Sequence, residues 1–163
     1  MSVVYMTGFE TGDGADVETA GTIGFTSAAA RTGAWGARCG NTFNSLKTGL
    51  NAKQVSFRGY CDFTAGAAGV GAVLQERVTA AVRLAVQFYS ASSVIALVDN
   101  DGTLGFSTAI GTVTASRGVS HRIEILLDTT AGGIVQMLVN GILDINTTHS
   151  LSATNVNSFA IRG

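Results

Sequence analysis

Two acidic side chains on one face of a single segment, Glu124 and Asp128, are the residues of this sequence that could most directly do chemistry. Arg122, Glu124, Leu126 and Asp128 share one face of a segment that alternates polar and apolar residues. Glycoside hydrolysis needs two carboxyl groups that flank the scissile bond. An arginine and a leucine stand where further carboxylates would be needed. The pattern therefore predicts an exposed polar face with an Arg–Glu neighbour pair.

The two histidines, His121 and His149, are the other candidates for acid–base or nucleophilic chemistry. His121 falls on the strand face that also carries Ile123 and Ile125, and His149 lies in a loop with neighbouring threonines. Neither accompanies a nucleophile elbow of the GxSxG type. We therefore predict that the chain is not an enzyme and has no catalytic residue.

Oxygen ligands for a hard cation such as calcium occur in two short acidic segments. Their spacing does not fit an EF-hand loop, and glycine, aspartate and threonine are also ordinary turn residues. Both segments are therefore predicted to be solvated turns, and no metal site is expected at Glu10, Asp13 and Asp16 or at Asp99, Asn100 and Asp101.

Two cysteines, Cys39 and Cys61, lack the CxxC spacing and the nearby histidines of a zinc site. Both stand in apolar surroundings, so we expect buried, unbridged thiols. The glycine-rich segments 66–71 and 102–111 contain neither GxGxxG nor the lysine of a phosphate-binding loop. No cofactor is predicted.

Sugar sites offer an exposed aromatic platform beside amides and carboxylates, and the aromatic share of this chain is only 7%. The available residues are Trp35, Tyr5, Tyr60 and Tyr89. Trp35 is predicted to pack in the core, because large aromatic side chains often anchor cores.

The elements that must position these residues are all expected to be strands, because no helix-length segment keeps a 3.6-residue period. The Ser120–Asp128 and Ile134–Asn140 segments form the clearest pair, separated by a glycine-bearing polar break. Proline is absent. We predict one all-β domain over residues 1–163, a two-sheet antiparallel sandwich, with further strands at Val3–Phe9, Thr22–Phe25, Trp35–Cys39, Ser45–Leu50, Gln54–Phe63, Val70–Val78, Ala81–Ser90, Val94–Val98, Thr103–Phe106, Gly111–Thr114, Ile142–Ile145 and Ser158–Arg162.

The surface of such a domain would be poor in charge. Charged residues make up 13% of the chain and the net charge is −1, against a usual charged share of about 25%. A weakly charged surface favours self-association. Because lysine and arginine are scattered singly, nucleic acid is not an expected partner. The sequence starts without a signal peptide and contains no membrane-length apolar run, so we expect a protein made in the cytoplasm with no membrane partner.

The order of these pieces resembles the concanavalin-A-like, laminin-G-like jelly rolls, in particular the stand-alone versions found among bacteriophage structural proteins. The resemblance lies in Met6–Glu10, Arg31–Arg38 (RTGAWGAR), Gln54–Phe63, Ser120–Asp128 followed by Val135–Gly141, and the closing Phe159–Gly163. It implies a two-sheet jelly roll. Members serve as glycan-binding modules, glucanases, adhesion domains and virion proteins, and fold alone does not choose among them.

Our leading hypothesis from the sequence is a non-enzymatic virion structural protein that decorates a capsid or forms part of a tail or fibre. It would act through homo-oligomer contacts and through docking on other virion proteins such as a major capsid protein. The alternative is a carbohydrate-binding or adhesion module of the lectin-like jelly-roll type. The weak surface charge favours the first hypothesis, and the family's glycan-binding members favour the second.

Overall fold

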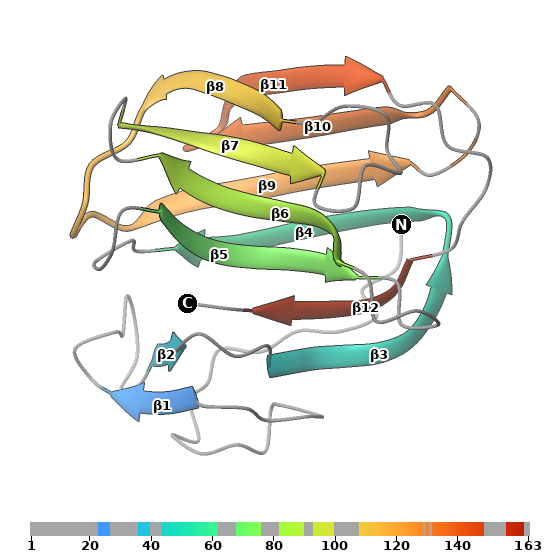
Figure 1. The fold of residues 1–163 in the computed structure, drawn as a ribbon, viewed down its shortest axis with the longest axis horizontal. Coiled ribbons are helices and arrows are strands. Elements are labelled where there is room, and N and C mark those ends of the chain that lie inside the picture. Colours follow the sequence, from blue (N-terminus) through green and yellow to red (C-terminus); the bar gives the residue numbers. More distant parts are fainter. Residues whose placement is uncertain are drawn as a thin grey trace.

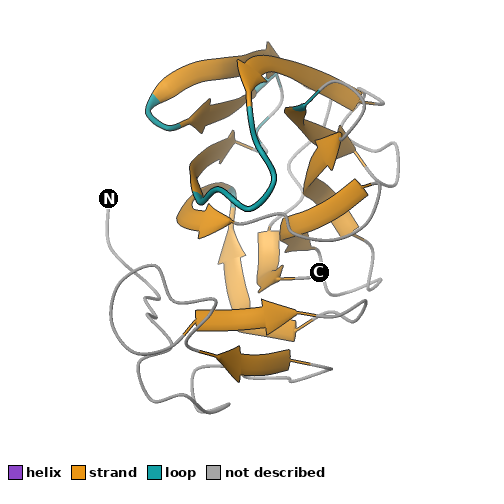
Figure 2. Cartoon of the chain, turned by 90° about the vertical axis from the view of Figure 1, so that its left-hand side faces the viewer, coloured by secondary structure: helices purple, strands orange, loops and turns teal. Residues whose placement is uncertain are grey.

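The computed structural model describes residues 23–26, 36–39, 44–61, 68–75, 82–89, 93–99, 108–128, 130, 132–148 and 156–161. Every regular element within these ranges is a strand (Figure 2). Likewise, no helix long and apolar enough to cross a membrane is found in this part of the chain. The strands are β1 (Ile23–Thr26), β2 (Gly36–Cys39), β3 (Asn44–Ala52), β4 (Gln54–Cys61), β5 (Ala68–Gln75), β6 (Val82–Tyr89), β7 (Val94–Asp99), β8 (Thr108–Thr114), β9 (His121–Asp128), β10 (Ile134–Val139), β11 (Ile142–Thr148) and β12 (Val156–Ile161).

Two large antiparallel sheets make up most of the described chain. One has four strands in the order β11-β10-β9-β4, and the other has six in the order β3-β12-β5-β6-β7-β8. Figure 1 shows β5 to β8 in front of β4, β9, β10 and β11. β1 and β2 form a separate two-stranded sheet. Since β3 leads directly into β4, and β8 into β9, the chain passes from one large sheet to the other at these points.

The core lies between the two large sheets and follows from the alternation of β9 and β10. Every second side chain of β9 is buried, from His121 to Leu127, and the neighbouring strand β10 buries Val135, Met137 and Val139. The six-stranded sheet contributes Val86, Ile95 and Leu97 to the same cluster. Burying a large aliphatic side chain stabilises the fold by about 1.5 to 3 kcal/mol, so this cluster holds the two sheets together.

The turn between β10 and β11 is a two-residue hairpin, because both of its residues adopt a positive φ. Asn140 has φ 54° and Gly141 has φ 86°, a combination that asparagine and glycine tolerate best and that matches the twist of paired strands. Asn140 also ties this turn to β9: its N–H donates to the Arg122 carbonyl at 2.8 Å, and its Oδ1 accepts from the Arg122 N–H at 3.0 Å.

An irregularity in β8 allows the two sheets to be joined at one edge. Val94 pairs with Thr114 and Ala96 pairs with Ile110, so β8 carries extra residues opposite a single residue of β7. The backbone N–H groups of Thr112 and Val113 donate to Oδ1 of Asp144 in β11, at 2.6 and 2.9 Å. One carboxylate of the four-stranded sheet thus holds the edge strand of the six-stranded sheet.

The predicted strands agree closely with the observed ones, with differences at their ends. Val3–Phe9 and Thr103–Phe106 lie outside the described residues. The predicted strand Ile134–Asn140 ends at Val139, because the positive φ of Asn140 cannot continue a strand. β9 begins at His121, and β8 begins three residues before the predicted Gly111. Finally, β11 continues past Ile145 to Thr148 because it stays paired with β10.

Candidate functional site

The surface of the four-stranded sheet that points away from the core gathers polar side chains from all four strands. Register places Arg58 opposite Glu124, Tyr60 opposite Arg122, and Gln136 opposite Asn146. We call this surface the outer face, and it comprises Gln54, Ser56, Arg58 and Tyr60 of β4, Arg122, Glu124, Leu126 and Asp128 of β9, Gln136 and Leu138 of β10, and Leu143 and Asn146 of β11.

Three charged residues form a connected group near the centre of this face. Glu124 Oε2 accepts from Arg58 Nε at 2.8 Å and lies 2.7 Å from Arg58 Nη2. Glu124 Oε1 lies 3.0 Å from Arg122 Nε, an ion pair whose angle is too poor for a hydrogen bond. We call these residues the ion triad. Two guanidinium groups face one carboxylate, so the triad carries net positive charge.

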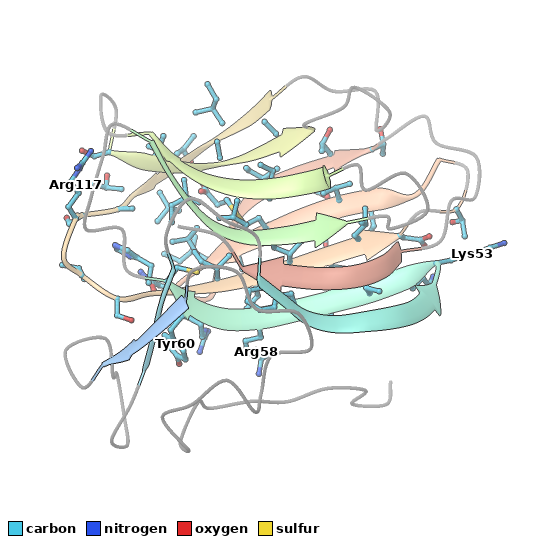
Figure 3. All side chains as sticks on the ribbon, turned by 60° about the horizontal axis from the view of Figure 1, so that its bottom comes forward. Lys53, Arg58, Tyr60 and Arg117 are labelled. Carbon is cyan, nitrogen blue, oxygen red and sulfur yellow. The ribbon has the colours of Figure 1, made fainter. Side chains whose placement is uncertain are left out.

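Tyr60 places an aromatic ring beside the triad. It stands opposite Arg122 in the β4–β9 register and is 47% exposed. Figure 3 shows Tyr60 and Arg58 projecting from the same side of β4. An exposed tyrosine presents both an apolar ring and a hydroxyl, which scattered surface lysines or serines do not offer together.

Amide side chains flank the triad along the sheet. Gln54 Nε2 donates to Asp128 Oδ2 at 2.9 Å, and Gln136 Nε2 donates to Asn146 Oδ1 at 3.1 Å. Leu138 and Leu143 oppose each other between these polar groups and the turn. The outer face can therefore offer hydrogen-bond donors, acceptors, a ring and a small apolar surface to one ligand.

The predicted polar face of β9 is present with its Arg–Glu neighbour pair, but it is half-buried rather than exposed, since only 17% of the Glu124 side chain is exposed. The sequence analysis missed Arg58, because only strand pairing brings it to Glu124. The alternation of polar residues in Gln54–Cys61 was the available signal. Glu124 and Asp128 are four residues apart along one strand, or about 13 Å at about 3.3 Å per residue. That separation exceeds the roughly 5 to 9.5 Å between the carboxyl groups of glycosidases.

The structure places His121 in the core, with 4% of its surface exposed. Its Nε2 lies 3.1 Å from the Ser116 carbonyl oxygen, and its Nδ1 lies 3.2 Å from Asn140 Nδ2. Nε2 also lies 3.1 Å from the backbone nitrogen of Ser116, and Asn140 Oδ1 accepts from the Arg122 N–H. Both ring nitrogens are thus used in holding the β8–β9 connection and the hairpin turn.

The remaining candidates are only partly covered by the described residues. Cys61 is half-buried rather than fully buried as expected, while the side chains of Cys39 and Asp99 are outside the described part. Across that part no group of three potential metal-ligating residues is found. The remaining candidate residues also lie outside the described part of the chain, namely Glu10, Asp13, Asp16, Trp35, Asn100, Asp101 and His149.

Replacing Glu124 with alanine should lower the free energy of unfolding by at most about 1 kcal/mol, because ion pairs with exposed partners are screened by water. The Arg58 side chain is 70% exposed and that of Arg122 is 39% exposed. Urea denaturation of the wild-type and Glu124→Ala proteins measures the difference. A loss of several kcal/mol would show instead that the triad is a structural element of the sheet.

Three solved structures share this architecture. A galectin of Caenorhabditis elegans, LEC-6, matches with a TM-score of 0.52 and 14% identity over 76% of this chain and 83% of the galectin. An endo-β-1,4-glucuronan lyase of the fungus Trichoderma reesei matches with a TM-score of 0.59 and 13% identity, covering 89% of this chain and 76% of the lyase. The fold is a jelly-roll sandwich. The third structure is the carbohydrate-binding module CBM66 of Bacillus subtilis, with a TM-score of 0.50 and 7% identity over 76% of this chain and 79% of the module.

The expected concanavalin-A-like sandwich is therefore confirmed as a fold. No protein-family model and no curated protein matches the sequence. Identities of this size establish the shared architecture only, so the function has to be argued from the outer face itself.

Proposed function

We propose that this protein is a non-enzymatic carbohydrate-binding module, and that it binds glycans on the outer face. The observation that carries the proposal is Tyr60, an exposed ring held beside the ion triad. A galectin and a carbohydrate-binding module among the proteins of like fold support the same choice.

The chemistry of the outer face suits a sugar ring. The apolar face of a pyranose packs on an aromatic ring, and its hydroxyl groups need donors and acceptors in fixed positions. Arg58 and Arg122 supply donors, and their contacts with Glu124 limit the side-chain motion that a ligand would otherwise have to stop. Strands of a paired sheet hold these groups more firmly than loops do.

The non-enzymatic part of the proposal is supported by the positions of the carboxylates. Both oxygens of the Glu124 carboxylate are already engaged, Oε2 by Arg58 and Oε1 by Arg122. Its nearest acidic neighbour along the strand, Asp128, is occupied by Gln54 and Thr130. Binding without turnover is therefore what this arrangement supports best.

Replacing Tyr60 with alanine should weaken glycan binding about two- to tenfold, because stacking on an aromatic ring contributes about 0.5 to 1.5 kcal/mol. The probes are lactose, cello-oligosaccharides and β-1,4-glucuronan oligomers, titrated by isothermal calorimetry. Arg58→Ala should weaken binding as well, and most for the glucuronan oligomers, because these carry carboxylates.

Val119→Ala is the matched control, since Val119 is 49% exposed but lies in the loop between β8 and β9. It should bind as the wild type does. The proposal fails if no probe binds, or if the Tyr60→Ala and Val119→Ala proteins bind a probe equally well. Product formation from any probe would instead establish an enzyme.

The virion hypothesis remains the second candidate, because one observation favours it. Large aliphatic side chains are exposed at both neighbouring sheet edges, with Ile110 of β8 at 58%, Ile142 at 59% and Leu143 of β11 at 52%. Exposed apolar residues on a weakly charged chain suit permanent docking on other copies or on a capsid protein. Peptide mass spectrometry of purified virus particles from producing cells would test it.

A further inference from the structure

β11 is an end strand of the four-stranded sheet and exposes two adjacent aliphatic side chains. It pairs with β10 on one side, and among the described residues no strand pairs with its other side. It lies at the rim of the molecule (Figure 1). Ile142 is 59% exposed and Leu143 is 52% exposed. An end strand of this kind presents unpaired backbone groups to which another strand can bind.

The exposed charges and prolines that commonly protect such an edge are missing from β11, although a bulge at Asp144 interrupts its pairing with β10. End strands commonly carry lysine, proline or outward charges that prevent pairing. β11 reads ILDINTT, and its one charged residue is Asp144. That carboxylate is turned toward β8, where Oδ1 accepts from the N–H groups of Thr112 and Val113. The exposed side of β11 therefore presents no charge.

The other edge of the same sheet and the neighbouring edge of the six-stranded sheet differ from β11 in this respect. β4, at the opposite edge of the same sheet, carries Arg58 and follows the exposed Lys53. β8, the neighbouring edge of the six-stranded sheet, is bulged and bound by Asp144. Of these three edges only β11 is both regular beyond its first residues and free of exposed charge.

We infer that β11 is the self-association edge of this protein, and that its occupant is β11 of a second copy. Two copies related by a two-fold axis would pair antiparallel and join two four-stranded sheets into one continuous sheet. Charge argues for a second copy: two neutral strands meet without repulsion, whereas a charged partner strand would find no opposite charge to pair with. The self-association expected from the weak surface charge would thus occur at β11.

This pairing would also fix the orientation of the two outer faces relative to each other. The two-fold axis of an antiparallel strand pair runs through the sheet from one face to the other, so both outer faces would point the same way. A dimer would offer two copies of Tyr60 and its ion triad on one surface. Association does not depend on the glycan proposal, because Tyr60 lies on β4 at the far edge of the sheet.

Sedimentation velocity in the presence of reductant tests the inference, with protein from about 1 to about 200 µM, the range over which interfaces of modest area assemble. We expect the wild type to shift from monomer to dimer. Leu143→Lys places like charges across the pair and should raise the dissociation constant at least tenfold. Val119→Lys, which adds the same charge at an exposed aliphatic position of the β8–β9 loop, should leave dimerisation unchanged.

Amide hydrogen exchange gives a readout that needs no variant. The β11 amides that face away from β10 should become more protected as the wild-type concentration rises, and those of β4 should not. A wild-type monomer at every concentration overturns the inference. So does a dimer that survives both Leu143→Lys and Ile142→Lys, or one that Val119→Lys disrupts equally. Tyr60→Ala should not affect the dimer, so failure of the glycan proposal would be distinguishable.

Discussion

Replacing Ile125 with alanine should lower the free energy of unfolding by about 2 to 5 kcal/mol, because it removes buried methyl groups and leaves a cavity that the neighbours cannot fill. Ile125 is 3% exposed and pairs with Phe57 on one side and Met137 on the other. It lies near the middle of β9, an inner strand that pairs with β4 on one side and with β10 on the other. Urea denaturation followed by circular dichroism measures the loss.

Ile110→Ala is the matched control, since the same groups are removed from a side chain that is 58% exposed and lies on β8 rather than on β11. Its cost should stay below about 0.5 kcal/mol, because little apolar surface returns to water. Equal costs for the two substitutions would mean that the alternation of β9 does not separate a buried face from an exposed one. The sandwich would then lose its principal stabilising strand.

Most of the four-stranded sheet could be predicted from the sequence, because the alternation of residue types along its strands shows which side chains are buried. His121, Ile123, Ile125 and Leu127 alternate with partly exposed residues, and a period of two is specific to a strand with one buried face. The Asn140-Gly141 turn fixes how β10 and β11 meet, since few residue pairs tolerate positive φ at both positions. The alternation of residues along β9 and the residue types of the Asn140-Gly141 turn were sufficient to predict these elements.

The ion triad could not be predicted in the same way, because it depends on which strands become neighbours. Arg58 and Glu124 are 66 residues apart in the chain and meet only through the β4–β9 register. Alternation shows which face a residue shares with its own strand, but it does not show which strand lies alongside. The candidate site could therefore be identified only once the sheet order was known. Tyr60 belongs to it only because β4 pairs with β9.

β7 shows a second limit of pattern reading. Val94, Ile95, Ala96 and Leu97 are consecutive and all buried, so the strand is covered on both faces and shows no alternation. A short apolar run of this kind is compatible with a buried strand, but the run itself does not say what covers the second face. The position of β7 between β6 and β8 came from the structure alone.

Replacing Asp144 with alanine is the second substitution with a large expected effect, at about 1 to 3 kcal/mol, because it removes several hydrogen bonds to one charged acceptor, including one from the half-buried backbone of Val113. Oδ1 accepts from the N–H of Thr112, from its hydroxyl and from the N–H of Val113. Those bonds hold the irregular part of β8 against β11. Gly111 is packed so closely beneath the carboxylate that a Cβ there would collide with Asp144 Oδ2 and the Ile95 carbonyl.

Asp144→Asn separates the hydrogen-bonding role from the charge. Asparagine keeps an acceptor where Oδ1 stands and places an amide where Oδ2 lies buried without a hydrogen-bond partner. It should therefore cost less than Asp144→Ala, by about 1 kcal/mol or more, if acceptance from the β8 backbone is what matters. Thermal unfolding of both variants, with hydrogen exchange at Thr112 and Val113, measures this. Equal destabilisation with equal loss of protection would show that the negative charge itself holds β8 in place.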